Sequence, residues 1–145
     1  MIKTPILAAV AMAFAGSAFA DEMEYMPPVT HAATLEECSA CHMAYPAGFL
    51  PAQSWRVMMT TLEDHFGENA GLDEETRAEI EAYLVANAGR DLSGDGAVPQ
   101  RISELPWFRH EHEEEVSKRQ FEKAKSWANC NACHERAEQG IFEDD

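Results

Sequence analysis

The chain has 145 residues, of which 26 are acidic and 11 are basic, so its formal charge is −15 at pH 7. Such a charge repels nucleic acid and anionic membrane surfaces and favours docking on a positively charged protein face. A chain of this length is expected to form one or two small domains, and a thin core in so small a protein often depends on a cross-link, a metal or a cofactor.

The first 20 residues have the layout of a secretory signal peptide. Lys3 precedes an apolar stretch, which ends in the A-x-A pattern Ala18-Phe19-Ala20. The apolar run is shorter than the roughly 20 residues that a membrane-spanning helix needs. We therefore expect export to the periplasm with cleavage after Ala20. The mature chain, residues 21–145, would keep 10 basic and 26 acidic residues, a formal charge of −16, and no membrane span.

All four cysteines lie in two copies of the pattern C-x-x-C-H, CSACH at 38–42 and CNACH at 130–134. This pattern is the attachment signature of c-type haem, in which two thiols bind the porphyrin and the histidine ligates the iron. Two disulfides, a redox dithiol and a Cys₄ zinc site are the alternatives. None of them requires a histidine after both cysteine pairs. The sequence therefore predicts two covalently attached haems, held by Cys38, Cys41, Cys130 and Cys133, with His42 and His134 as proximal ligands.

Four histidines remain as candidates for the opposite side of each iron, and methionine is a second ligand type. The candidates are His31, His65, His110 and His112, with Met23, Met26, Met43, Met58 and Met59. The chain after His134 contains neither residue type. The second haem must therefore take any further protein ligand from upstream. We keep His31, in a segment expected to be irregular, as a reserve candidate.

Residues 53–66, QSWRVMMTTLEDHF, predict a helix whose apolar side chains recur at three- and four-residue spacing. Gly67 and Asn69 are expected to end it. His65 projects from this apolar stripe, and we favour it as the distal ligand of the first haem over a packed core histidine. Met58 and Met59 are interpreted as haem-packing side chains.

Residues 72–89 predict a second helix, with Asp73 as its N-cap and Gly89 as its stop. Its charged residues predict a solvated outer face without chemistry. The following stretch, 89–106, contains three glycines and two prolines and predicts a loop between two haem-binding halves, residues 21–90 and 91–145.

A third helix is expected from about Trp107 to Asn129. His110 and His112 would point about 200° apart on a helix, so at most one of them can face a given haem. Phe108, His112 and Val116 share a face, whereas His110 lies among charged residues. We therefore choose His112 over His110 as the distal ligand of the second haem.

The sequence resembles the dihaem cytochrome c family of small exported electron carriers. The resemblance is carried by residues 38–73, by RISELPWFRHEHEEEV at 101–116, and by the second CNACH. It implies an all-α, cytochrome c-like fold with histidine on both sides of each iron, His65 and His112 matching the distal ligands. His110 stands where the family is expected to have a basic residue. Family members are thought to take electrons from a membrane cytochrome b and pass them to a small oxygen-binding monohaem cytochrome.

We therefore expect a periplasmic electron carrier, not an enzyme, with two bis-histidine haems and a redox partner that has a basic docking face. One alternative is a haem enzyme or ligand-binding cytochrome, such as a peroxidase, with one open iron. The other is the small electron-feeding subunit of a periplasmic reductase. The sequence supplies enough histidines to close both irons, so it does not require an open one.

Overall fold

The computed structural model describes residues 25–91, 98–113 and 115–143. Within them the regular structure is helical apart from isolated bridges, which confirms the all-α prediction. The α-helices are α2 (Ala32–Cys38), α3 (Ala52–Thr60), α4 (Glu74–Ala86), α5 (Pro106–Glu113) and α6 (Lys118–Ala124). None of the described helices has the length and apolar character needed to cross a bilayer. The predicted signal peptide, residues 1–20, lies outside the described residues.

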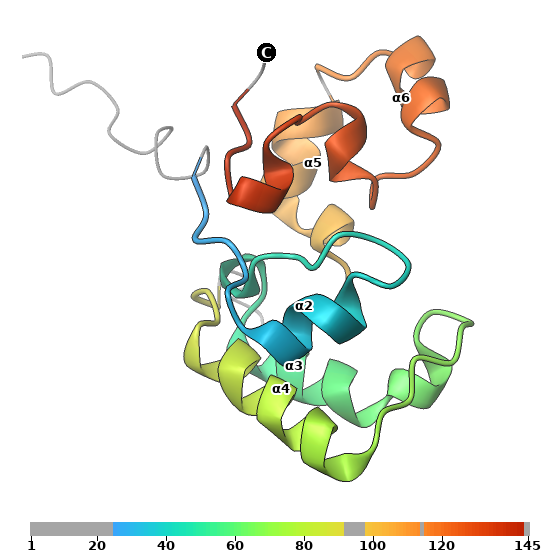
Figure 1. The fold of residues 1–145 in the computed structure, drawn as a ribbon. Helices are drawn as coiled ribbons and strands as arrows, with labels where there is room; N and C mark the ends of the chain where they lie inside the picture. Colours follow the sequence, from blue (N-terminus) through green and yellow to red (C-terminus); the bar gives the residue numbers. More distant parts are fainter. Residues whose placement is uncertain (1–24, 92–97, 114, 144–145) are drawn as a thin grey trace, which may run out of the picture.

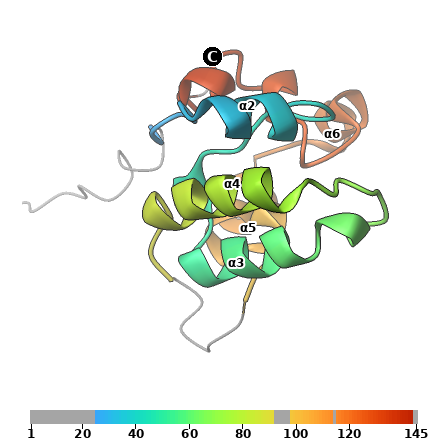
Figure 2. The ribbon, with the colours of Figure 1, turned by 60° about the horizontal axis from the view of Figure 1, so that its bottom comes forward.

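The helices gather in two groups, with α2, α3 and α4 in one and α5, α6 and the C-terminal segment in the other (Figure 1). In the turned view, α3 and α4 run side by side (Figure 2). One apolar cluster connects the groups; its buried members are Ala47, Leu50, Trp55, Met59, Ile80, Leu84, Leu105 and Phe108. Since Leu105 and Phe108 flank the start of α5, the second group is anchored in the core of the first.

The prediction for α4 is largely confirmed. Asp73 caps the helix, because its side chain accepts hydrogen bonds from the backbone N–H groups of Glu75 and Thr76. The helix ends at Ala86, before the expected stop at Gly89. Gly89 instead lies where the chain passes very close to the loop after the first attachment motif. A Cβ atom at Gly89 would lie 2.0 Å from the carbonyl oxygen of Gly48, so this packing requires glycine.

The predicted helix over 53–66 is wrong at its C-terminal end. Helix α3 stops at Thr60, and His65 lies outside it. The hydroxyls of Thr60 and Thr61 both donate to the carbonyl oxygen of Val57, at 2.8 and 3.0 Å. Threonine side chains that bond the backbone in this way compete with continued helix formation. The chain then forms a 3₁₀ turn, Leu62–Asp64, that leads into His65.

The predicted single helix over 107–129 is also wrong, because the structure has two short helices there, α5 and α6. Ser117 begins α6 with a capping box: its side chain accepts from the backbone N–H of Gln120, whose side chain in turn accepts from the backbone N–H of Ser117. Lys125 ends the helix in the left-handed region, at φ 68°. The chain then turns back, and His134 of the second attachment motif lies opposite His112 of α5.

The N-terminal segment that we expected to be irregular contains α2, which starts directly after His31. The residues before it pair with the end of the chain. The N–H of Met26 donates to the carbonyl oxygen of Gly140 at 2.8 Å, and Tyr25 bridges Ile141. The two ends of the described chain therefore hold each other beside the second attachment motif.

Candidate haem-binding sites

The first attachment motif follows directly from α2, whose last residue is Cys38. The Nδ1 atom of His42 lies 2.7 Å from the carbonyl oxygen of Met43, to which a protonated Nδ1 donates. That tautomer leaves the Nε2 lone pair free for a metal, and a hydrogen bond at the far nitrogen raises the basicity of a ligating imidazole. The ring of Tyr45 stacks on His42, with centroids 4.8 Å apart. His42 is thus fixed on one edge and one face.

His65 is presented by a tight turn and not by a helix. The backbone N–H of His65 donates to Glu68 at 2.7 Å, and the N–H of Glu68 donates back to His65 at 3.2 Å. The two central residues, Phe66 and Gly67, have φ of 56° and 98°, as in a type I′ turn. A phenylalanine in this region is strained, and strain of this kind is concentrated at functional sites.

The turn brings His65 opposite His42. Their ring centroids are 6.2 Å apart, and their planes differ by 28°. Burial lowers the pKa of His65, and the neighbouring His42 and Arg101 lower it further. His65 is therefore held as a neutral imidazole, which is the form that ligates a metal.

The second attachment motif forms a 3₁₀ turn, Cys130–Ala132, followed by Cys133 and His134. The ring of His134 meets the edge of Phe142, with centroids 5.7 Å apart. Its Nδ1 atom is buried and has no hydrogen-bond partner among the described residues. Packing therefore holds His134, whereas a hydrogen bond holds His42.

His112 projects from α5 toward His134. Its ring stacks directly on Phe108, with centroids 3.9 Å apart and planes 7° from parallel. Its Nδ1 lies 2.9 Å from the carbonyl oxygen of Phe108, so a proton there again leaves Nε2 free. Trp127 meets the ring edge-on at 5.9 Å. The centroids of His112 and His134 are 6.1 Å apart, with planes 77° apart.

Both separations fit two imidazoles on opposite sides of one metal. An imidazole nitrogen lies about 2 Å from a metal that it ligates and its ring centre about 1 Å farther, so the two centroids would be about 6 Å apart. The remaining histidines face elsewhere. His110 is exposed, and His31 stacks on Tyr83 and pairs with Glu79 at 3.0 Å.

The cysteines fit covalent attachment better than the alternative cysteine chemistries. None of the four cysteines forms a disulfide. Burial raises the pKa of Cys130 to about 11 and also raises that of Cys38, with Glu37 adding to the latter. Reactive redox dithiols have lowered pKa values instead. In the part of the chain that the structure describes, no three His, Cys, Asp or Glu side chains form a metal-binding group, which argues against a Cys₄ zinc site.

Open hollows lie against both candidate distal histidines. One of about 520 Å³ is lined by His65, Met58 and Phe66, among others. A second, of about 320 Å³, is lined by His112 and Trp127, among others.

A family model described as dihaem cytochrome c matches residues 34–142. The chain belongs to the dihaem cytochrome c family. It therefore carries two c-type haems, and the cysteine pairs 38/41 and 130/133 are consistent with their attachment. The electron-carrier role expected from the sequence fits this family. No curated protein matches the chain.

Solved structures support the same assignment. A dihaem cytochrome c from Rhodobacter sphaeroides is 56% identical, with a TM-score of 0.76 over 80% of this chain and 99% of that one. A second structure from that organism, of purified DHC, is 59% identical, with a TM-score of 0.73 over 79% and 99%. The dihaem cytochrome of Shewanella baltica is 43% identical, with a TM-score of 0.68 over 77% and 86%.

Several side chains that hold the candidate ligands did not emerge from the sequence. Tyr45 and Trp127 contact His42 and His112, respectively, and neither follows the helical periodicity on which the ligand choice depended. The helical period placed Phe108 on the same helix face as His112, and the structure shows that the two rings stack. Tyr45 and Trp127 lie outside the helices, so helical spacing along the chain gives no signal for their contacts.

Proposed function

We propose that this dihaem cytochrome is an exported electron carrier in which each iron has two histidine ligands, His42 with His65 and His112 with His134. The observation that carries the proposal is the pair of facing histidines at each attachment motif, 6.2 and 6.1 Å apart between ring centroids. When bound, each haem takes up and releases one electron. Fixed histidines on both sides keep the coordination the same in both oxidation states, so little reorganisation accompanies the transfer.

The two facing histidine pairs favour a carrier over an enzyme with an open iron. Peroxidase-like chemistry needs a free coordination position, and both facing pairs leave none. Two histidine ligands also favour lower reduction potentials than a histidine–methionine pair, which raises the potential. A carrier of this kind accepts electrons from a low-potential donor, such as a membrane cytochrome b. The signal-like layout of residues 1–20 supports its export.

His112→Ala distinguishes the two candidate ligands of the second haem. We expect the variant to bind carbon monoxide at half of its reduced haem, because His112 faces His134. His110→Ala removes an exposed histidine from the same helix and should bind none. The reduced absorption spectrum of each variant, with and without the gas, makes the comparison. Gas binding in the His110 variant alone would reverse the assignment.

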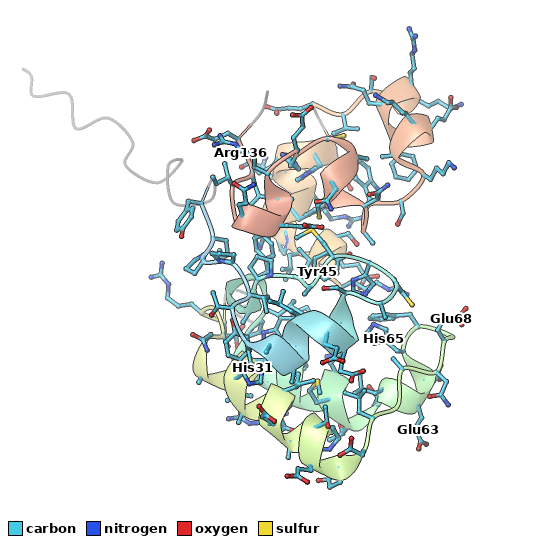
Figure 3. The ribbon with its side chains drawn as sticks, in the orientation of Figure 1. His31, Tyr45, Glu63, His65, Glu68 and Arg136 are labelled. Carbon is cyan, nitrogen blue, oxygen red and sulfur yellow. The ribbon has the colours of Figure 1, made fainter. Side chains whose placement is uncertain are left out.

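We further propose that the acceptor is a small haem protein with a basic face, which docks around the turn that presents His65. The ring of Phe66 lies at this turn, 47% exposed, with the guanidinium of Arg101 over one of its faces. The carboxylates of Glu63, Asp64 and Glu68, close by in the chain, are exposed; Glu63 and Glu68 are labelled in Figure 3. An aromatic side chain within a charged rim is a common arrangement of protein interfaces. The surplus of 15 negative charges would also speed the encounter with a basic partner.

Stopped-flow oxidation of the reduced protein by a basic monohaem cytochrome c tests this function. The rate should fall steeply with added salt, because salt screens the attraction. Glu63→Gln/Glu68→Gln should lower the rate at low salt several-fold. Glu115→Gln/Glu122→Gln removes the same charge from exposed positions near and on α6 and should lower it less. Absence of electron transfer would contradict the carrier function. Equal effects of the two double variants would contradict docking at the turn of His65.

A further inference from the structure

Tyr45 lies at the junction of the two groups of helices (Figure 3). Its ring stacks on the imidazole of His42, with centroids 4.8 Å apart and planes 17° from parallel. Its hydroxyl donates a hydrogen bond of 2.6 Å to the backbone carbonyl of Ala128, 83 residues along the chain. Ala128 lies two residues before Cys130. One side chain therefore contacts a ligand of the first site and the attachment segment of the second.

The loop around Tyr45 is firmly packed. Its neighbours on both sides, Ala44 and Pro46, are buried, and Ala47 is 3% exposed. The Nε1–H of Trp55 donates to the carbonyl oxygen of Ala47 at 2.8 Å, which ties the loop to α3. The position of the Tyr45 ring is thus set by the core of the first group of helices. Its hydroxyl then fixes where the second attachment segment lies relative to that core.

A second aromatic connection between the groups runs through Phe49. Its ring stacks on Trp107 at 5.7 Å and meets the edge of Phe142 at 5.0 Å, and Phe142 in turn contacts His134. Among the described ring contacts, however, Phe49 touches neither candidate ligand of the first site. Tyr45 provides the more direct connection, because it contacts His42 itself.

We propose that Tyr45 couples the two haems and carries the electron exchange between them, an inference that rests on the proposed carrier function. The route runs from the His42 imidazole through the Tyr45 ring and hydroxyl to the Ala128 carbonyl, and along the backbone to Cys130. One iron is oxidised and the other is reduced by the same single electron. The hydroxyl keeps its proton, and no bond forms or breaks.

The physical reason is that electronic coupling decays more slowly through covalent and hydrogen bonds than across an empty gap. The route contains one ring stack and one hydrogen bond of 2.6 Å, and its other steps are covalent. Removal of the hydroxyl would replace the hydrogen bond with a van der Waals gap. The ring stack on His42, and with it the ligation of the first iron, would stay.

Tyr45→Phe makes this change in the holoprotein. Electron exchange between the haems can be measured in half-reduced samples, from the NMR line broadening of haem methyl protons. The two sites should be distinguishable, since their imidazole planes differ by 28° and 77°. We expect exchange to slow several-fold, independently of protein concentration, while both reduction potentials stay at the wild-type values.

Tyr83→Phe is a matched control. Tyr83 also stacks on a histidine, His31, with centroids 4.8 Å apart and planes 15° from parallel, and its hydroxyl also takes part in a hydrogen bond, from the N–H of Thr30. In the described ring contacts His31 faces none of the four candidate ligands, so the control should exchange electrons at the wild-type rate. Chemical denaturation of all three proteins measures any loss of stability separately.

A wild-type exchange rate in Tyr45→Phe would overturn the proposal, whether or not the variant is less stable, because a purely structural role predicts that result. The carrier function would remain. Slowing to the same extent in Tyr83→Phe would overturn it as well. Absence of exchange between the haems of the wild-type protein would also overturn the proposal, whereas failure of the stopped-flow oxidation would contradict the carrier function from which it starts.

Discussion

Replacing His65 with alanine is expected to open one of the two irons to carbon monoxide and to leave both haems covalently attached. Attachment depends on the cysteines, whereas in the proposed arrangement His65 closes only the far side of the first iron. The side chain projects from a turn bordered by an open hollow, so its removal leaves room for the gas. The reduced spectrum of the variant should shift by half on addition of carbon monoxide.

His31→Ala is the control for this variant, because it removes another histidine from the same group of helices. His31 is occupied by Tyr83 and Glu79, and its loss should leave both irons closed. Two low-spin, gas-insensitive haems in His65→Ala would show that the first distal ligand is a different residue. Gas binding in His31→Ala would point to His31 itself.

The double variant Cys130→Ala/Cys133→Ala is expected to lose the second haem and, with it, the fold of residues 115–143. The buried residues of this segment are small: Ala124, Ala137 and Gly140. Burial of so little apolar surface does not offset the conformational entropy of ordering the chain. The second haem would supply the missing core, as cofactors do in small proteins.

Amide hydrogen exchange, read by mass spectrometry, measures this loss segment by segment. Helices α3 and α4 should stay protected in the variant, because Trp55, Met59, Ile80 and Leu84 form their own buried contacts. Residues 115–143 should exchange as an unfolded chain does. Wild-type protection of that segment would show that its fold does not need the haem.

The sequence was sufficient to predict the cofactor and the helical class, since both follow from local patterns. Two C-x-x-C-H motifs predict two haems wherever they occur in a fold. Asp73 was identified as an N-cap because the residues that cap a helix lie within one turn of it. The choice between His110 and His112 needed only the helical period, and in the structure His110 is exposed while His112 is half-buried.

The two helix boundaries were predicted wrongly for different reasons. The pattern Ser117-x-x-Gln120 is a capping box that the sequence displays, and it marks the start of α6. The end of α3 has no such signal, because Thr60 and Thr61 occur both inside helices and at their ends. The positive φ of Phe66 was also unpredictable, since the hydrogen bonds between His65 and Glu68 that close its turn require no particular residue type there.

The contact between Tyr45 and Ala128 joins residues 83 positions apart. Spacing and periodicity describe neighbours within an element, so they give no information on a contact of this range. The same holds for the facing of His42 and His65, which depends on a turn that the periodic pattern missed. The sequence predicted which histidine serves each haem, and the structure was needed to see the turn and the contacts that bring each pair face to face.

The most direct test of the account is the optical spectrum of the dithionite-reduced wild-type protein, recorded with and without carbon monoxide. If two histidines close each iron, carbon monoxide has no free position to bind. The account therefore predicts a spectrum that the gas does not change. A shift of half of the haem absorbance would mean that one iron is open in the native protein. The protein would then be a gas-binding or catalytic cytochrome, and the pairing of histidines proposed for that haem would be wrong.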